Sequence, residues 1–214
     1  MLTGRPLTNI ILYTGGNAAL APEIADTFTA GIVLSPSIMP GFQFSADYYD
    51  IKIKDVITTL NAQQIVNSCH GGNSSACAQI TRNSAGNISE INATYINVAS
   101  FRTKGVDLEA TYRTELDGLG LPGQLNIRAL ANYVDKLLSG GLDGAGYLGS
   151  QAPYLIPKWR GSLTTTYESE RFGGDIRVRY VDGGGYAPAT VLAGQGDGVG
   201  ISSRWYFDLG ARVY

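Results

Sequence analysis

The sequence predicts an all-β protein, built as an antiparallel up-and-down segment of a transmembrane β-barrel. Three observations predict this fold class. Apolar and polar residues alternate with a period of two in about seven segments of roughly ten residues, the pattern of strands with one apolar face. The connections between the segments alternate between short and long, and aromatic residues gather near the segment ends. Barrels that cross a membrane have short turns on one rim, long loops on the other, and aromatic residues at both interfaces.

The alternation is clearest in one segment near the middle of the chain. Val106 and Leu108 occupy one parity there, and Asp107 and Glu109 occupy the other. Successive side chains of a strand point to opposite faces, so each segment has one apolar and one polar face. Strands of roughly ten residues are long for a soluble sheet and suit a tilted strand that crosses a bilayer. The predicted strands span residues 27–35, 42–51, 105–113, 124–133, 159–168, 175–180 and 204–213.

The connections fall into two groups of different length. The first long connection contains Ile57, Leu60, Gln64 and Ile65, which fit one side of a short helix. A connection of that length is uncommon in a compact domain and is usually functional. Residues 1–26, polar and rich in glycine, are expected to be irregular. The short connections are 36–41, 116–123 and 169–172, and the long ones are 54–97, 138–156 and 183–200.

The composition argues against several other classes. With 44% hydrophobic and only 16% charged residues, the chain does not have the composition of a disordered protein. Its 16 Lys and Arg residues are outnumbered by 18 Asp and Glu residues, so we expect no nucleic-acid partner. No apolar run approaches the roughly 18 residues that a membrane-spanning helix needs. One His and two Cys residues leave little material for a catalytic set, so we expect no enzyme and no cofactor.

Alternation alone also fits a soluble β-sandwich that binds a ligand such as a carbohydrate. In a sandwich the apolar face is the core, whereas in a membrane barrel it meets lipid and the polar face lines a watery interior. Small residues occupy the middle of the apolar face, among them Ala46, Ala110, Ala129 and Ala211. A packed core uses bulkier side chains, while lipid tails fill any shape, so the pattern favours the barrel. A barrel-resident enzyme is a third hypothesis, without a visible catalytic set.

Charged side chains interrupt the polar faces in the middle of the predicted strands. In a barrel these charges face the lumen. Their arginines are candidates to line a path for anionic substrates. The signs are nearly balanced and cross-strand charge pairs are common, so we favour pairing between neighbouring strands or contact with a plug. The predicted lumen-facing residues are Asp107, Glu109, Arg128, Asp175, Arg177, Arg179, Asp208 and Arg212.

Cys69 and Cys77 enclose a short polar stretch of the first long connection. In an exported barrel they predict a disulfide, because the periplasm is oxidising. Two free thiols and a metal site are the alternatives. His70 beside Cys69 invites the metal interpretation, but two cysteines and one histidine supply only three ligands, and we predict no metal site.

Four glycines near the end of the chain superficially resemble a phosphate cradle. Gly194, Gly196, Gly198 and Gly200 alternate with other residues. A dinucleotide-binding fingerprint follows a strand and opens a helix, whereas these glycines precede a predicted strand and no helical pattern follows. We therefore interpret them as part of an outer loop.

Several segments occur in an order and spacing known from one protein family. Residues 16–31 read GNAALAPEIADTFTAG, and residues 44–55 read FSADYYDIKIKD. The connection with AQQIV at 62–66 and the segment GVDLEA at 105–110 follow. These segments resemble TonB-dependent outer-membrane receptors, whose corresponding stretch reads roughly G-N-x-x-L-x-P-E-x-x-x-T-x-x-x-G. The resemblance covers about residues 16–135 and fits the strand pattern of the remainder.

The resemblance implies a barrel of 22 strands, plugged by an N-terminal domain, in the outer membrane of a Gram-negative bacterium. Such receptors take up ferric siderophores, vitamin B12 or oligosaccharides with energy relayed by TonB. The implied partners are outer-membrane lipid, a plug, the remaining barrel strands, the TonB complex and an unknown small ligand. No plug or signal peptide is recognised here, so residues 1–214 are expected to form one partial barrel domain of about seven of the 22 strands.

Overall fold

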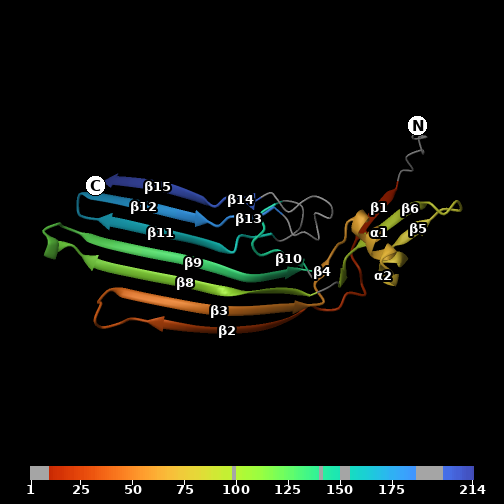
Figure 1. The fold of residues 1–214 in the computed structure, drawn as a ribbon, viewed down its shortest axis with the longest axis horizontal. Helices are drawn as coiled ribbons and strands as arrows, with labels where there is room; N and C mark the ends of the chain where they lie inside the picture. The colour runs from red at the N-terminus through yellow and green to blue at the C-terminus, as the bar shows by residue number, and fades with distance from the viewer. Residues whose placement is uncertain (1–9, 98–99, 140–141, 150–154, 187–199) are drawn as a thin grey trace. The chain divides into compact units, whose positions relative to one another are not determined.

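The computed structural model describes residues 10–97, 100–139, 142–149, 155–186 and 200–214 of the protein (Figure 1). The chain divides into two compact units. The sheet unit comprises Ala25–Ile53 and Ser100–Tyr214, and the small unit comprises Met1–Ile24 and Lys54–Ala99.

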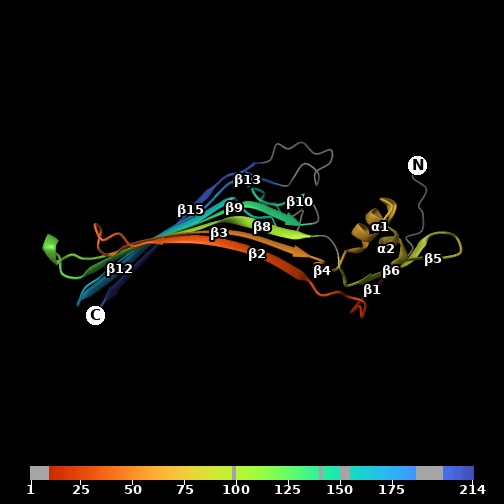
Figure 2. The same cartoon turned by 90° about the horizontal axis from the view of Figure 1, so that it is seen from below.

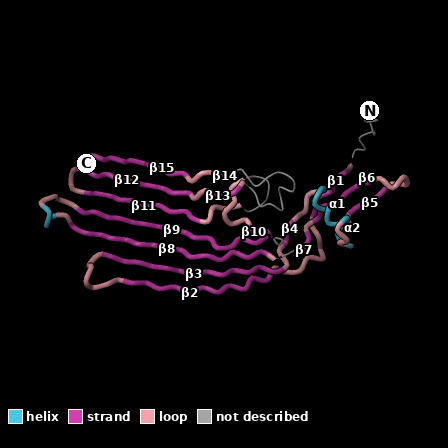
Figure 3. Tube along the Cα trace, viewed as in Figure 1, coloured by secondary structure: helices cyan, strands magenta, loops and turns pink. Residues whose placement is uncertain are grey.

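Long antiparallel strands make up the sheet unit, and each lies beside the strand that precedes it in this unit (Figure 3). In the described residues the order across the sheet is β15-β12-β11-β9-β8-β3-β2, an up-and-down arrangement. Two-residue strands lie at one end, where β10 (Leu142–Asp143) pairs with β9, and β13 (Gly184–Gly185) pairs with β14 (Gly200–Ile201). The long strands are β2 (Ile24–Leu34), β3 (Phe42–Lys54), β8 (Phe101–Glu115), β9 (Gln124–Ser139), β11 (Trp159–Glu168), β12 (Phe172–Val181) and β15 (Arg204–Val213).

The turns at one end of the sheet are short and depend on glycine. Gly41 has a φ of 82°, and a Cβ there would lie 2.0 Å from the carbonyl oxygen of Arg113 on β8. Gly123 has a φ of 109°, and its Cβ would lie 2.2 Å from the carbonyl oxygen of Glu168. A residue with a side chain fits neither position, so these glycines let neighbouring strands stay in register beside the turns. The long connections lie at the other end, which confirms the predicted asymmetry of the two rims.

The seven predicted strands are confirmed, but β8 and β9 continue further toward the long connections than predicted. The register of this pair shifts between Lys104 and Gly105, so Asp135 is an extra residue on β9. A β-bulge of this kind breaks the alternation of faces. Val134 and Leu137 are consequently both buried, although they are three residues apart. The period of two therefore ends at Tyr133, which is where the prediction stopped.

The sheet unit is a single twisted layer, as the turned view in Figure 2 shows. Its apolar side chains remain exposed, with Ile32 at 51% and Leu209 at 79% of their full accessibility. A cluster of buried apolar residues lies at the long-connection end and is formed by Val134, Leu137 and Ala145. Two packed sheets would bury the apolar face, so the sandwich alternative is wrong for the described residues.

The small unit has a separate core, formed by Ile65, Ile91 and Ala93. Its central strand β6 pairs in parallel with β1 and antiparallel with β5. Two helices accompany this sheet, and in the described part of the chain no helix is long and apolar enough to cross a membrane. The elements are β1 (Ile11–Gly15), β4 (Ile57–Thr58), α1 (Ala62–His70), α2 (Ser74–Ala78), β5 (Ile80–Arg82), β6 (Ile88–Thr94) and β7 (Ile96–Asn97).

Two expectations for the small unit were wrong in detail. Residues 11–15 form β1 instead of an irregular segment, because β6 supplies a hydrogen-bonding partner about 80 residues away in the sequence. Ile57 and Leu60 precede the helix, which begins at Ala62. Asn61 caps it, since its side chain accepts from the backbone N–H of Gln64 and the Gln64 side chain accepts from Asn61. This reciprocal pair fixes the start of the helix.

Candidate functional site: the polar face of the sheet

The polar face of the sheet unit collects charged side chains from several neighbouring strands. One row of this face runs through residues paired in register, from Thr111 through Arg128, Thr164 and Arg177 to Asp208. Every second residue along each strand lies on the same face, so the predicted charges share it. They lie on β8 (Asp107, Glu109), β9 (Arg128), β12 (Asp175, Arg177, Arg179) and β15 (Asp208, Arg212).

Three of the four arginines in this set form ion pairs with a carboxylate on a neighbouring strand. All six partners are about one third to one half exposed, so each pair contributes only about 0–1 kcal/mol to the free energy of unfolding. Their main effect is to hold the long side chains in place along the face. The pairs are Arg128 Nε with Glu109 Oε1 at 2.8 Å, Arg179 Nε with Asp208 Oδ2 at 3.1 Å, and Arg212 Nη2 with Asp175 Oδ1 at 3.2 Å.

The other two predicted charges have no ion pair among the described residues. Arg177 lies opposite Asp208 in the register, but the Asp208 carboxylate accepts hydrogen bonds from Arg179 instead. Asp107 accepts a 2.6 Å hydrogen bond from the Asn132 side-chain amide. The guanidinium of Arg177 is therefore a cation that no described carboxylate neutralises.

The surroundings of Asn132 have unused hydrogen-bonding capacity. Its Nδ2 donates to Asp107 and lies 3.5 Å from the Tyr49 hydroxyl. Its Oδ1 is buried and has no hydrogen-bond partner in the part of the chain that is described. Asp47 lies opposite Asp107 in the register of β3 and β8. Buried polar atoms are usually paired, so this corner of the polar face is suited to hydrogen-bond a polar molecule.

The polar face is hollowed over β8, β9, β11 and β12. One hollow of about 530 Å³ is lined by Asp107, Asn132, Arg160 and Arg179, among others. A second, of about 670 Å³, lies nearer the short turns beside Glu109, Arg113 and Arg128. Both contain groups of either sign together with neutral hydrogen-bonding side chains. Such a surface can replace part of the hydration of a polar solute without favouring one charge strongly.

The opposite face is an apolar band between two aromatic rows. At the long-connection end, Tyr133 and Trp159 have ring centroids 4.7 Å apart, as do Tyr180 and Trp205. At the short-turn end, Phe42 lies opposite Tyr112 in the register. Tyrosine and tryptophan rings are apolar but carry a polar tip, which suits them to the two edges of a membrane. The aliphatic side chains between these rows include Ile32, Leu163, Ile176 and Leu209, all at least 43% exposed.

A sequence profile described as TonB dependent receptor-like, beta-barrel matches residues 3–214. The chain belongs to this family. A search of curated proteins returned no match. The TonB-dependent receptor family consists of outer-membrane transporters of Gram-negative bacteria rather than enzymes, and its members are embedded in the membrane, carry a plug domain and interact with TonB. The up-and-down sheet is therefore a segment of a receptor barrel.

Beyond the aromatic row at the long-connection end, the strands of this receptor barrel segment carry ion pairs. Arg102 donates to Asp50 through Nε at 2.8 Å and also through Nη2. This hydrogen bond lowers the pKa of Asp50 and raises that of Arg102. Lys104 likewise lowers the pKa of Asp135, mainly through a side-chain hydrogen bond. These four groups lie outside the apolar band and carry full charge at neutral pH.

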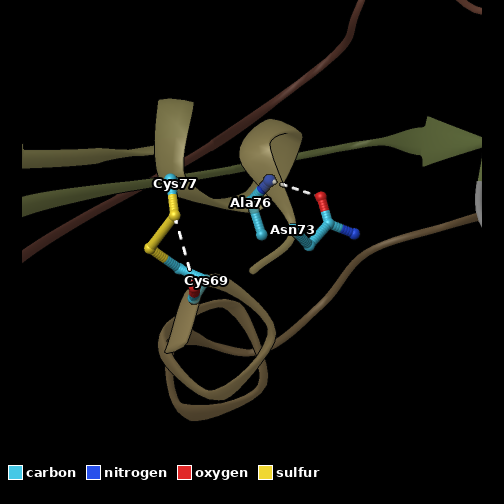
Figure 4. The surroundings of a disulfide bond; sticks show 4 residues. All are labelled: Cys69, Asn73, Ala76 and Cys77. Carbon is cyan, nitrogen blue, oxygen red and sulfur yellow. Dashed lines mark hydrogen bonds between the residues drawn. A yellow bond between two sulfur atoms is a disulfide. The ribbon is translucent and has the colours of Figure 1, made fainter. Parts of the chain in front are cut away.

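The cysteines of this receptor segment lie in the small unit, at the end of α1 and within α2 (Figure 4). In the structure, Cys69 and Cys77 are joined as a disulfide with their Cα atoms 4.6 Å apart. Asn73 caps α2 by accepting from the backbone N–H of Ala76, so the chain turns back between the helices. His70 follows Cys69, but the described residues contain no group of His, Cys, Asp and Glu side chains that is suited to a metal ion.

Most of the glycine-rich segment of this receptor lies outside the described residues. Gly194, Gly196 and Gly198 lie outside the described residues, and Gly200 begins β14. The sequence reasoning missed Asn132 and Tyr49 on the polar face. Their parity places them there, but neither is charged, and the predicted lumen-facing residues are all charged.

Proposed function

We propose that this chain forms part of the wall of an outer-membrane transporter that takes up a scarce nutrient, such as a ferric siderophore, vitamin B12 or an oligosaccharide. The apolar band faces lipid, and the polar face with its ion pairs faces the barrel interior. The single observation that supports this orientation is the exposed apolar band, which no second protein layer covers in the described residues. A soluble protein does not leave such a large contiguous apolar surface in water.

The polar face then lines part of the route of the nutrient. Its charges are mostly paired in the described residues, so the wall presents hydrogen-bonding groups of both signs. Arg177, which has no ion pair in the described residues, and the Asn132 amide oxygen are among the groups with hydrogen-bonding capacity left for a solute or a plug. We propose that the ligand is selected mainly by the long connections and by a plug domain, because the wall itself discriminates only weakly by charge.

The edge strands also support a larger assembly. In the described residues, β2 and β15 each have a neighbour on one side only. An unpaired strand edge is a template for another strand, and a lipid environment allows no open edge. We propose that residues 1–214 are a partial barrel domain, that further strands close the barrel, and that a plug and the TonB complex act through the complete receptor.

Adjacent residues of β11 give a sharp test of the orientation. Spin labels would be attached to Leu163→Cys and, in a separate protein, to Thr164→Cys of the complete receptor in vesicles, without reductant so that the disulfide stays intact. We expect the label at position 163 to collide with dissolved oxygen, which concentrates in lipid, and the label at 164 with a water-soluble nickel complex. The opposite accessibility would refute the proposed orientation.

The nutrient is identified by deleting the receptor gene and measuring growth and uptake on each candidate in turn. We expect uptake of one nutrient class to fall and to return when the gene is restored. Unchanged uptake of a ferric siderophore, vitamin B12 and oligosaccharides would contradict the proposed range of ligands while leaving the orientation open to the spin-label test.

A further inference from the structure

Four basic side chains lie on the apolar side of the sheet, beyond the aromatic row of the long-connection end. Lys52 pairs in register with Arg102, and Lys104 pairs with Lys136. Asp50 pairs in register with Lys104. The pair Tyr48–Val106, which is in line with the aromatic row, precedes Asp50 by two residues along β3. Two residues of a strand span roughly 7 Å, so the basic side chains begin within one headgroup depth of the aromatic row.

These four side chains differ in how many of their hydrogen-bond donors already bind a carboxylate. Among the described residues, Lys52 and Lys136 have no ion pair and are both exposed. Arg102 binds Asp50 through Nε and Nη2, which leaves Nη1 free. Lys104 forms an ion pair with Asp135, and an ammonium group has three donors. The carboxylates thus hold two of the cations in position without using all their donors.

The carboxylates on this side are fewer than the cations. Asp26 lies with Asp50, Lys52 and Arg102 around an open depression, and Asp135 lies beside Lys104. These three carboxylates are fewer than the basic side chains on this face, which are the four above and Lys54 at the end of β3. At the short-turn end, by contrast, the same face continues with Thr114, Leu125 and Tyr167, none of which is charged. In the described strands, charge on the apolar face is consequently confined to the end where a barrel of this kind has its extracellular loops.

We propose that Lys52, Arg102, Lys104 and Lys136 form a binding site for the phosphate groups of a lipid in the outer leaflet. This inference rests on the proposed orientation of the sheet. The acyl chains lie along the apolar band, the sugar or glycerol part lies against Tyr48 and Tyr133, and the phosphates meet the basic side chains. Arginine and lysine are the usual protein ligands of phosphate, and their placement next to an aromatic row matches the order of layers in a lipid.

The test uses the complete receptor in detergent and titrates it with a diphosphorylated glycolipid, the same lipid without phosphates, and inorganic phosphate. The variant Lys52→Gln/Lys136→Gln removes two cations that have no described ion pair, so it breaks no pair. The control Arg160→Gln/Arg204→Gln removes two cations from the polar face. We expect the first variant to bind the diphosphorylated lipid about 25-fold more weakly, about fivefold per cation, and the control to bind like the wild type.

Any of the following results would contradict the proposed lipid-phosphate site. Equal binding of the lipid without phosphates would show recognition of acyl chains alone. Competition by inorganic phosphate at the concentration of the lipid would indicate a site for free phosphate. Wild-type binding by Lys52→Gln/Lys136→Gln, with the label at position 163 still accessible to oxygen, would refute the lipid site and leave the transporter proposal standing. A label at 163 that is accessible only from water would refute both.

Discussion

The ring of Tyr49 lies against Gly105 on the neighbouring strand, on the polar face of the sheet. A Cβ at Gly105 would lie 2.6 Å from the Tyr49 hydroxyl oxygen and 2.1 Å from the backbone carbonyl oxygen of Tyr133. Gly105 also adjoins the bulge between β8 and β9. The absence of a side chain at this position therefore lets Tyr49 lie across β8 toward Asn132 and lets the bulge close.

We predict that Gly105→Ala destabilises the barrel by about 1–3 kcal/mol, because the added methyl group meets a backbone atom that cannot move freely. The unfolding midpoint of the complete receptor in detergent, followed by circular dichroism, measures the effect. Gly118→Ala is the matched control, since a Cβ there meets nothing within 4 Å. Equal midpoints for both variants would show that the close approach of Tyr49 and Tyr133 is unimportant.

Leu163 lies in the apolar band, and its neighbour Ser162 lies on the polar face. We predict that Leu163→Arg lowers the free energy of unfolding in a bilayer by about 2–4 kcal/mol, the cost of a charge in the middle of the lipid-facing wall. Ser162→Arg, one residue away, is expected to cost less than 1 kcal/mol, because its side chain enters water. Folding titrations in urea with lipid vesicles measure both, and a reversed order would contradict the assignment of the two faces.

The ion pair of Arg128 with Glu109 joins half-exposed side chains. We predict that Arg128→Gln changes the free energy of unfolding by no more than about 1 kcal/mol, and that the difference shrinks as salt is added. Chemical denaturation at low and high ionic strength measures it. A loss of several kcal/mol that is insensitive to salt would mean that the pair is buried in the assembled receptor by a plug or another protein segment.

The disulfide between Cys69 and Cys77 closes a short loop in the small unit. We predict that a digest of the non-reduced protein contains one cross-linked peptide and that Cys69→Ser/Cys77→Ser destabilises the small unit by about 2–3 kcal/mol. Limited proteolysis is expected to cut the double variant sooner between residues 62 and 82, with no change in the sheet unit. Free thiols in the native protein would refute the pairing.

Ile65 is fully buried at the centre of the small unit. We predict that Ile65→Ala costs about 2–5 kcal/mol of the local stability, because it removes most of a side chain from a core that has few other members. Hydrogen exchange of the amides of β6 reports this local loss. Val66→Ala is the comparison, since Val66 is only partly buried against the same core, and an equal effect of both variants would show that Ile65 is not its centre.

The strands and faces of the sheet unit were readable from the sequence because both follow from the period of two. Val106, Leu108 and Ala110 identify a strand and its apolar face without knowledge of any neighbour. Glycines such as Gly41 and Gly123 likewise mark turns whose geometry is local. What the sequence by itself determined is thus the number of long strands, their alternating faces and the two unequal rims.

Only the tertiary structure decided which residues meet across strands. Contacts between residues distant in the sequence decide three features. They are the bulge at Asp135, the ion pair of Asp208 with Arg179 instead of Arg177, and the parallel pairing of β1 with β6. Register and side-chain reach select these contacts, and neither leaves a periodic trace in the chain. The same holds for the basic cluster of the outer wall, because Lys52, Arg102 and Lys136 become neighbours only when three strands pair.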